Sequence, residues 1–207
     1  GELWRILGVF DATSHGQNGQ NLVKIVRNDS LGALSWDKND TNDWPNSSLY
    51  HLLNEYYYNG TNESTPTYCY GYSGVPANCD FVNDGITSSI YRNMIQNATW
   101  YLGGTESIGA AGVAYTAERG TTVYTGRSTS TTGNIGLMYA SDYGYSVLAS
   151  SCARTTKLSS YATSACAGQS WLYGKGYEWT IVPDSSNSNR VWHLSYNGYV
   201  YSLSAYY

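Results

Sequence analysis

The sequence NIGLMYASDYG, residues 134–144, is the longest apolar-leaning run of this chain with turn residues on both sides, and it separates two differently built halves. Ile135, Leu137 and Tyr139 alternate with smaller residues, a pattern that predicts a strand with one face against the core. Asp142 then predicts a turn, in which we expect its carboxylate to accept hydrogen bonds from nearby backbone N–H groups. We expect this central strand to carry the apolar face that joins the two halves.

Few residues of this chain carry a charge. Its 207 residues include 11 Lys and Arg against 15 Asp and Glu, which gives a net charge of −4, while Tyr and Gly number 22 each. The mildly acidic balance disfavours nucleic acid and anionic membranes as main partners. A surface that is polar through hydroxyl and amide groups is typical of extracellular proteins. We therefore expect an extracellular protein.

The length predicts one globular domain over residues 1–207. No run of 18 or more apolar residues occurs, so we expect no membrane span in this chain. The start at Gly1, without an initiator Met or a signal-like apolar segment, indicates a mature or excised piece.

The four cysteines form two pairs of sequence neighbours, Cys69 with Cys79 and Cys152 with Cys166. Four cysteines allow three connectivities, and a zinc site is the alternative interpretation, although the spacing of zinc-binding motifs is missing. We favour disulfides between neighbours, because each pair encloses a loop rich in small residues. Closing such loops would contribute roughly 2–3 kcal/mol each. Disulfides predict an oxidising compartment.

The periodicities predict an α+β fold with an antiparallel sheet core and two helices. Strands over 3–10, 22–27 and 31–36 would form a meander. The first helix begins after Trp44 and Pro45 and has an apolar face made of Leu49, Leu52, Leu53 and Tyr56.

A second helix is expected from Asp84 or Thr87 to Gly103, because apolar residues recur there with helical spacing: Ile90, Met94, Ala98 and Tyr101. The segment 105–133 is rich in Gly and Thr and predicts one weak strand, near Val113 or Val123. Strands are expected at 170–173 and 177–183. The last hairpin has strands over 190–196 and 199–206, joined by Asn197-Gly198, a signal for a type I′ turn.

Oxygen-bearing side chains recur at every second position of one loop, as in a calcium-binding loop: Asp37, Asn39, Thr41 and Asp43. Asn42 stands where an EF-hand has Gly, and Ser48 where it has the bidentate Glu. The other interpretation is a solvated turn that leads into the first helix. We expect no cofactor, with Ca²⁺ as a weak candidate at these residues.

Aromatic residues gather in the last quarter of the chain: Trp171, Tyr173, Tyr177, Trp179, Trp192, Tyr196, Tyr199 and Tyr201. Strand alternation places some of them in the core, where Trp171 and Trp179 are expected, and others outside. Outward Tyr and Trp rings suit sugars and protein partners. They also suit contacts between subunits. The candidate ligand-binding residues are Trp192, Tyr196, Tyr199 and Tyr201.

Catalytic motifs are not apparent. His15, His51 and His193 lie outside recognisable metal or triad patterns, and no nucleophile elbow, phosphate loop or dinucleotide fingerprint occurs. Asp142 and Glu178 are the pair that a glycoside hydrolase would need, but each also suits a structural role. We therefore expect a protein that is not an enzyme.

Several motifs, in this order, resemble a domain of unassigned activity found on secreted and surface proteins of gut Firmicutes and their relatives. The most specific is GLMYASDYGY at 136–145. The others are LVKIVR at 22–27, NDW at 42–44, LLN at 52–54, CDF at 79–81, Trp100 with Gly103, WLY at 171–173 and WTIVP at 179–183.

The resemblance implies display outside the cell, because such domains often follow a prepilin-type helix or another membrane anchor. WTIVP followed by a hairpin also resembles, more loosely, the core of C-type-lectin-like folds. Family members continue into a further strand after the position of Tyr207, which either lies in a longer chain or comes from a neighbouring subunit.

Two functions follow as expectations. In the first, the chain is a subunit or head domain of a pilus-like filament with an adhesive role. In the second, it is a lectin-like adhesin outside a filament. The partner would be another copy of the chain, or a glycan or protein on a cell surface.

Overall fold

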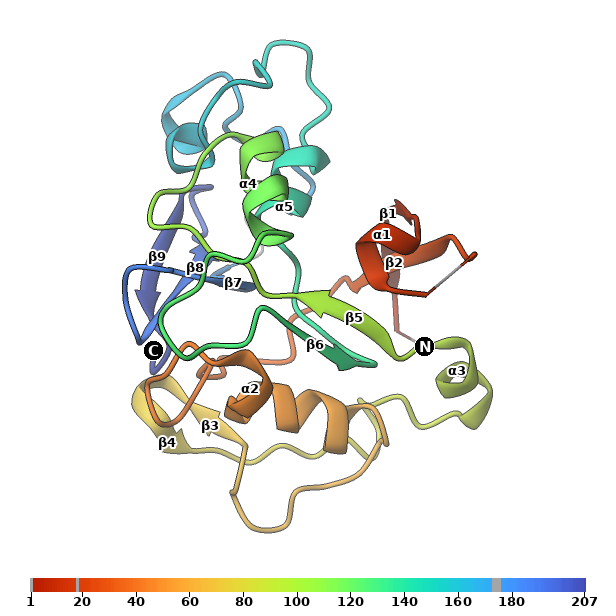
Figure 1. Cartoon of the computed structure of the whole chain (residues 1–207). Helices are drawn as coiled ribbons and strands as arrows, with labels where there is room; N and C mark the ends of the chain where they lie inside the picture. Colours follow the sequence, from red (N-terminus) through yellow and green to blue (C-terminus); the bar gives the residue numbers. More distant parts are fainter. Residues whose placement is uncertain (1, 18, 173–175) are drawn as a thin grey trace. The chain divides into compact units, whose positions relative to one another are not determined.

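The computed structural model describes residues 2–17, 19–172 and 176–207, and it has the predicted α+β composition (Figure 1). Contacts divide the chain into two compact units. Unit 1 comprises Gly1–Trp100, Ser130–Gly136 and Ser204–Tyr207, and unit 2 comprises Tyr101–Thr129 and Leu137–Leu203. Within the described ranges, none of the helices has both the length and the apolar composition needed to span a membrane.

Unit 1 begins with an antiparallel hairpin of β1 (Trp4–Phe10) and β2 (Leu22–Arg27), linked through the short helix α1 (Ala12–His15). These are two of the three strands of the predicted meander. The third strand, over 31–36, was wrong, because this segment makes isolated hydrogen bonds and no ladder.

The predicted first helix consists of three consecutive pieces: the 3₁₀ turn η1 (Trp44–Asn46), α2 (Ser48–His51) and the π-helix η2 (Leu52–Tyr57). Ser47 is the N-cap, since its side chain accepts a hydrogen bond from the N–H of Tyr50 at 3.2 Å.

The π turn changes which residues of this helix face the core. The leucines of the predicted apolar face are buried, but Tyr57 completes the face, whereas Tyr56 is only half-buried. In a π turn an N–H bonds the carbonyl five residues earlier, as the N–H of Tyr58 does with Leu53 at 3.0 Å. The wider turn therefore moves the apolar face by one position.

The predicted second helix was wrong over most of its length. Only α3 (Ser89–Met94) is helical, and Ala98 and Tyr101 lie on the strand β5 (Ala98–Tyr101), which pairs with β6 (Ser130–Gly133). Ile90 and Met94 are 70% and 73% exposed. Their helical spacing therefore does not mark a core face.

Unit 2 contains two helices that the sequence did not predict, α4 (Ala111–Glu118) and α5 (Ala140–Ser146) (Figure 1). The strand expected over 134–144 was therefore wrong. The weak strand expected near Val113 or Val123 was also misplaced, because Val113 lies in α4, Val123 lies outside any strand, and the strand of this segment is β6 at its end. The chain passes from unit 1 to unit 2 within this stretch, after Gly136.

Asp142 is the third residue of α5 and caps its first turn, which explains why this stretch is helical. Its carboxylate accepts the N–H of Tyr139 at 2.7 Å, so the prediction of a carboxylate that binds nearby backbone is confirmed. Gly144 lies inside the helix and not in a turn. A Cβ at Gly144 would lie 2.6 Å from the Cβ of Ala111, so glycine allows α4 and α5 to approach closely.

The last part of unit 2 is a three-stranded sheet in the order β7 (Glu178–Pro183), β8 (Arg190–Leu194) and β9 (Val200–Ser204), as predicted. The strand expected over 170–173 was wrong: residues 170–172 lie in bends and turns, and Tyr173 is outside the described residues.

The turn between β8 and β9 is not of the predicted type I′. That type needs positive φ at both Asn197 and Gly198, but Gly198 has a φ of +88° and Asn197 does not have a positive φ. The N–H of Gly198 donates to the carbonyl of Ser195 at 2.9 Å. This is the three-residue turn with a left-handed glycine, and it places Tyr196 at the tip.

Both predicted disulfides are formed, which is consistent with an extracellular protein. Cys69–Cys79 encloses β3 (Tyr70–Gly71), the turn η3 (Tyr72–Gly74) and β4 (Val75–Pro76) in unit 1. Cys152–Cys166 encloses the 3₁₀ helix η4 (Leu158–Thr163) in unit 2. All four cysteines are buried.

Candidate functional site

One face of the β7–β8–β9 sheet carries five aromatic side chains, which we call the aromatic face: Tyr177, Trp179, His193, Tyr196 and Tyr201. Trp179 pairs with His193 in the register of β7 and β8, so both side chains point to the same side. Because all five residues belong to unit 2, this arrangement lies within one compact unit.

The rings of the aromatic face contact one another around His193. The centroid of its ring lies 4.0 Å from that of Tyr201, 5.5 Å from that of Trp179 and 6.0 Å from that of Tyr177. Tyr177 also meets Tyr196 edge to face, with centroids 5.4 Å apart. These are favourable aromatic geometries, and they produce one continuous surface.

The tyrosines of this face are open to solvent. Tyr177 is 62% exposed, Tyr196 57% and Tyr201 38%, whereas His193 beneath them is 2% exposed. The surface therefore presents rings and phenol hydroxyl groups, with an imidazole as its floor.

His193 lacks a hydrogen bond to either ring nitrogen among the residues that the structure describes. Leaving such groups buried and unpaired costs free energy, of order 1–3 kcal/mol for each. Burial lowers the pKa of His193 from 6.5 to about 4. The imidazole is therefore neutral at physiological pH, and the aromatic face carries no formal charge.

Two of the four ligand-binding residues expected from the sequence, Tyr196 and Tyr201, belong to this face. Trp192 points to the other side of β8, where it is buried and its indole N–H donates to the carbonyl of Thr105 at 3.0 Å. Tyr199 is half-buried, and its carbonyl accepts the N–H of Ser195 at 2.8 Å in closing the turn.

The sequence analysis did not select the other three members of the face. Tyr177 and Trp179 are two residues apart, a spacing that places both on one side of an extended chain. His193 could not be assigned to this face from the sequence, because that assignment requires the register between β7 and β8. Trp179, expected in the core, is half-buried.

The four weak calcium candidates lie in the loop before η1. The carboxylate of Asp37 is buried and accepts the N–H of Thr41 at 3.1 Å and that of Ser48 at 3.0 Å. The Thr41 hydroxyl also donates to it at 2.8 Å, and Asp43 accepts the amide of Asn46. Asn39 is exposed. These contacts explain why the loop needs its carboxylates without a metal ion.

His, Cys, Asp and Glu side chains do not gather anywhere in the described residues into a group of three or more that could hold a metal ion. Asp142, half of the pair that a glycoside hydrolase would need, is buried at the start of α5. Glu178 lies on β7, where alternation with Trp179 directs it away from the aromatic face.

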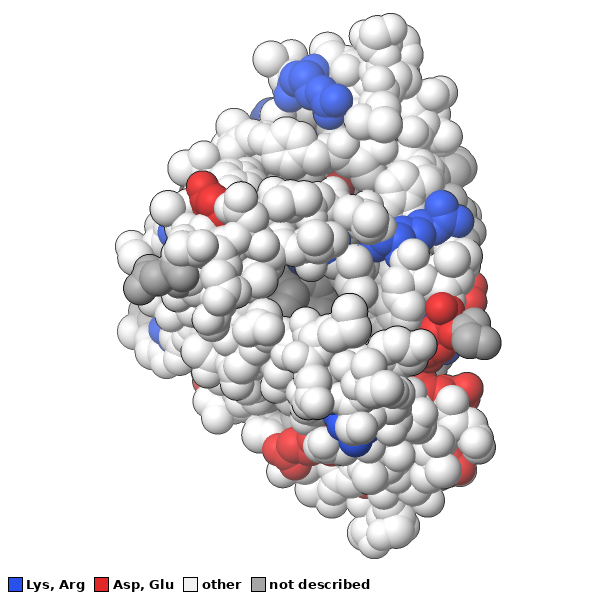
Figure 2. Space-filling view, turned by 90° about the vertical axis from the view of Figure 1, so that its right-hand side faces the viewer, with Lys and Arg blue, Asp and Glu red and all other residues white. Residues whose placement is uncertain are grey.

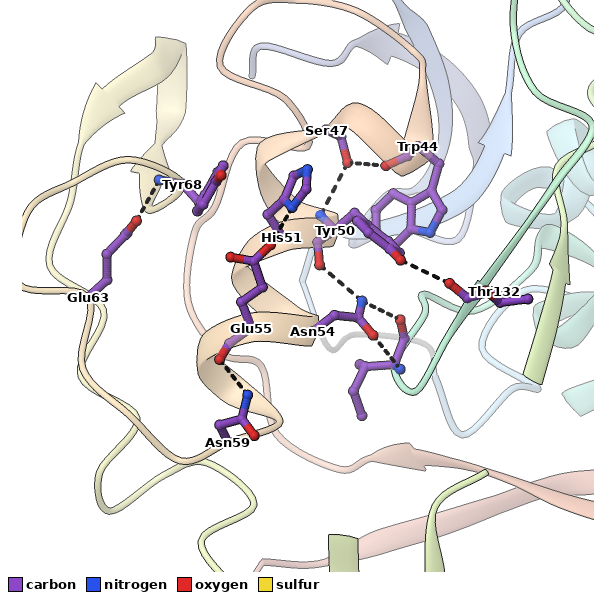
Figure 3. Close-up of polar contacts among 11 residues, drawn as sticks. Trp44, Ser47, Tyr50, His51, Asn54, Glu55, Asn59, Glu63, Tyr68 and Thr132 are labelled. Atoms are coloured by element: carbon purple, nitrogen blue, oxygen red, sulfur yellow. Dashed lines mark hydrogen bonds and ion pairs between the residues drawn. The ribbon is translucent and has the colours of Figure 1, made fainter. Parts of the chain in front are cut away.

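A second polar group lies on the helix formed by α2 and η2 in unit 1 (Figure 3). His51 and Glu55 form an exposed pair, with 2.6 Å between the His51 Nδ1 and a carboxylate oxygen, and the His51 ring stacks on Tyr68. Asn54 and Tyr50 instead bind the backbone of residues 132–135. Most of this group therefore holds a chain segment in place.

The buried carboxylate of Glu118 has a structural role as well. It accepts hydrogen bonds from the backbone N–H of Ser141, at 2.8 Å, and from the Ser141 hydroxyl group, so it satisfies donors in the first turn of α5. Burial raises the pKa of Glu118 from 4.5 to about 7.

No family model, curated protein or solved structure matches this chain. The candidate site therefore depends on its geometry alone.

Proposed function

We propose that this chain is a non-catalytic extracellular domain that binds a ligand at the cell surface. The observation that supports this best is the aromatic face, where exposed Tyr177, Tyr196 and Tyr201 surround the buried, neutral ring of His193. Exposed Tyr side chains give large contact area at a small cost in conformational entropy, and they are enriched in binding surfaces.

The surroundings agree with such a role. The two disulfides suit an oxidising compartment. Figure 2 shows one side of the molecule, where charged side chains lie in separate small groups among uncharged residues. Recognition through rings and hydroxyl groups suits this surface better than recognition through charge.

Binding to cells tests this proposal. Fluorescently labelled protein is titrated onto target cells, and the double variant Tyr177→Ala, Tyr196→Ala is compared with Tyr72→Ala. Tyr72 is a matched control because it is 63% exposed and lies in unit 1. The double variant is expected to lose most of the binding and the control to keep it; equal binding by all three would contradict the proposal.

The filament is the second candidate function, and a different observation favours it. The β1–β2 hairpin exposes four apolar side chains, Ile6 (69%), Val9 (66%), Val23 (56%) and Ile25 (46%), which we call the apolar hairpin face. The register pairs Ile6 with Ile25 and Val9 with Val23, and an irregularity before Gly8 keeps both pairs on one side.

The opposite side of this hairpin carries Lys24. Its ammonium group lies 5.8 Å from the ring centroid of Phe10 and 5.4 Å from that of Trp100. A hairpin with its apolar side chains outward gains stability when those side chains are covered. Alternation places Arg27 at the end of this same side, where its charge is paired with Glu2 at 3.0 Å. The four apolar side chains next to it can pack on a second copy of themselves, so we propose that the copies of a filament meet here.

Assembly is measured by analytical ultracentrifugation and by electron microscopy of concentrated protein. Ile6→Thr with Ile25→Thr should abolish self-association without affecting cell binding. Ile90→Thr is the control, because Ile90 is 70% exposed on α3. A wild-type chain that stays monomeric at high concentration would reject the filament and leave the adhesin outside a filament.

The finer features of the resemblance also remain proposals. Display on the bacterial surface predicts that external protease removes the protein from intact cells. A C-type-lectin-like arrangement of the β7–β8–β9 sheet is supported by its predicted strand at WTIVP and by the loop closed with Cys152–Cys166. A crystal structure compared with known lectin domains tests it.

A further inference from the structure

We propose that the ligand of the aromatic face is the neutral pyranose ring of a glycan, which packs against Tyr177 and Tyr196 and has hydroxyl groups that bond the phenols and His193. This inference rests on the proposed function, since it names the ligand class of the same surface.

The absence of charge on this face favours a neutral ligand. None of its five side chains carries a formal charge at neutral pH, and Glu178 points to the other side of the sheet. A phosphate, a sulfated sugar or an acidic peptide would find no cation among these five side chains to balance its own charge.

The spacing of the rings argues against an organic cation. A quaternary ammonium group between two aromatic walls lies within about 6 Å of each centroid and needs a gap between the walls. Tyr177 and Tyr196 are in edge-to-face contact with centroids 5.4 Å apart, and Tyr201 touches His193 at 4.0 Å. The rings fill the space between one another, so they offer a continuous platform and not a cage.

The polar groups of the platform suit hydroxyl groups. Tyr177 contacts Tyr196 with ring centroids 5.4 Å apart, and Tyr177 and Tyr201 both contact the ring of His193, so three phenols share this surface. A phenol both donates and accepts hydrogen bonds, as sugar hydroxyls do. A purely apolar partner would leave these groups unsatisfied.

His193 supplies the second observation. It is 2% exposed, and neither ring nitrogen has a hydrogen-bond partner among the described residues. A neutral imidazole has one donor and one acceptor nitrogen, and a hydroxyl group can serve either. The ring of Tyr177 lies 6.0 Å from that of His193 and is 62% exposed, so a small outward shift of this side chain would let a hydroxyl group of a sugar bound against it reach the imidazole.

The test measures binding of the full chain to immobilised mannan, laminarin and arabinogalactan, with heparin and phosphocholine-conjugated albumin as charged alternatives. We expect saturable binding to at least one of the neutral polysaccharides and none to the other two probes. Tyr177→Ala and Tyr196→Ala should each weaken this binding about tenfold, the equivalent of one lost stacking contact.

His193→Phe separates stacking from hydrogen bonding. It keeps the aromatic floor and should still weaken polysaccharide binding several-fold, while Tyr72→Ala leaves binding unchanged. Thermal melts of every variant establish that unit 2 is folded. Equal affinity of His193→Phe and wild type would remove the imidazole from the proposed site.

The treatment of target cells distinguishes failure of this inference from failure of the proposed function. Target cells are treated either with protease, which destroys proteins, or with periodate, which destroys sugars. If Tyr177→Ala and Tyr196→Ala abolish cell binding, and protease but not periodate removes the binding sites, the face binds a protein and the glycan inference is wrong. Preference for heparin or phosphocholine, or no binding to any neutral polysaccharide, also overturns it. If the alanine variants bind cells normally, the proposed function fails.

Discussion

Asn54 holds the backbone of Ile135 from both directions: its amide nitrogen donates to the Ile135 carbonyl at 3.0 Å, and its oxygen accepts the Ile135 N–H at 3.0 Å. The same side chain binds the carbonyl of Tyr50 (Figure 3) and the N–H of Asn134. One amide therefore joins the π-helical segment of unit 1 to the segment 130–136, which lies about eighty positions further along the chain.

Asn54→Leu should be strongly destabilising, because four hydrogen bonds are lost and backbone groups remain unpaired. We expect the free energy of unfolding to fall by roughly 3 kcal/mol in urea titrations. Asn59→Leu is the control, since Asn59 is exposed and makes a single bond to the Glu55 carbonyl. It should cost less than about 1 kcal/mol; similar losses in both variants would show that Asn54 is not a clamp.

Glu118 should make the protein less stable as the pH rises from about 4.5 to about 7. Its pKa is raised by burial from 4.5 in the ordinary case to about 7 in the fold, so the folded state holds the proton more tightly. Stability from this group is complete below pH 4.5 and is lost as the pH passes through 7, by roughly 3 kcal/mol. Glu118→Gln should flatten this part of the stability profile, measured by urea unfolding at each pH. An unchanged slope would contradict the assignment.

His193 should make the protein less stable as the pH falls, which is the opposite of the effect of Glu118. Burial lowers its pKa from 6.5 to about 4, so the unfolded chain takes up the proton first as the pH falls. Stability from this group is present above pH 6.5 and is lost towards pH 4, again by roughly 3 kcal/mol. His193→Phe should remove this loss and leave the Glu118 slope, and the combination with Glu118→Gln should give a nearly flat profile between pH 4 and 7. A wild-type profile that does not change in His193→Phe would be evidence against a buried neutral imidazole.

The two disulfides should stabilise separate units. Replacing Cys152 and Cys166 by Ala removes a crosslink with a sequence separation of 14 residues, and Cys69 and Cys79 close one of 10. Each double replacement should cost roughly 2–3 kcal/mol. Hydrogen exchange followed by mass spectrometry should find faster exchange mainly in the unit that carried the lost bond. Faster exchange throughout the chain would instead indicate one cooperative domain.

Local patterns predicted several parts of this fold well. The hairpin of β1 and β2, the strands of the last sheet and the N-cap before Tyr50 follow from alternation and from capping residues close in sequence. The neighbour pairing of cysteines is confirmed for the same reason, because short loops bring the partners together.

Other parts were wrong where local patterns permit two structures. Residues 134–144 alternate like a strand. However, the Asp142 carboxylate accepts the N–H of Tyr139, and Gly144 leaves room for Ala111 of α4, so the second half of this stretch is the helix α5. The apolar face of the first helix moved from Tyr56 to Tyr57, because the π turn adds a residue that no periodic template includes.

By itself, the sequence determined the α+β class, the two disulfides, the sparse charge and the aromatic character of the last quarter, because these depend on composition and on neighbours along the chain. Only the tertiary structure decided which rings meet. Tyr177 and Tyr201 are 24 positions apart, and both meet His193 because β8 lies between β7 and β9 in the sheet. It also decided that residues 134–144 end as a helix, since the capping and close packing that select this conformation exist only in the folded chain.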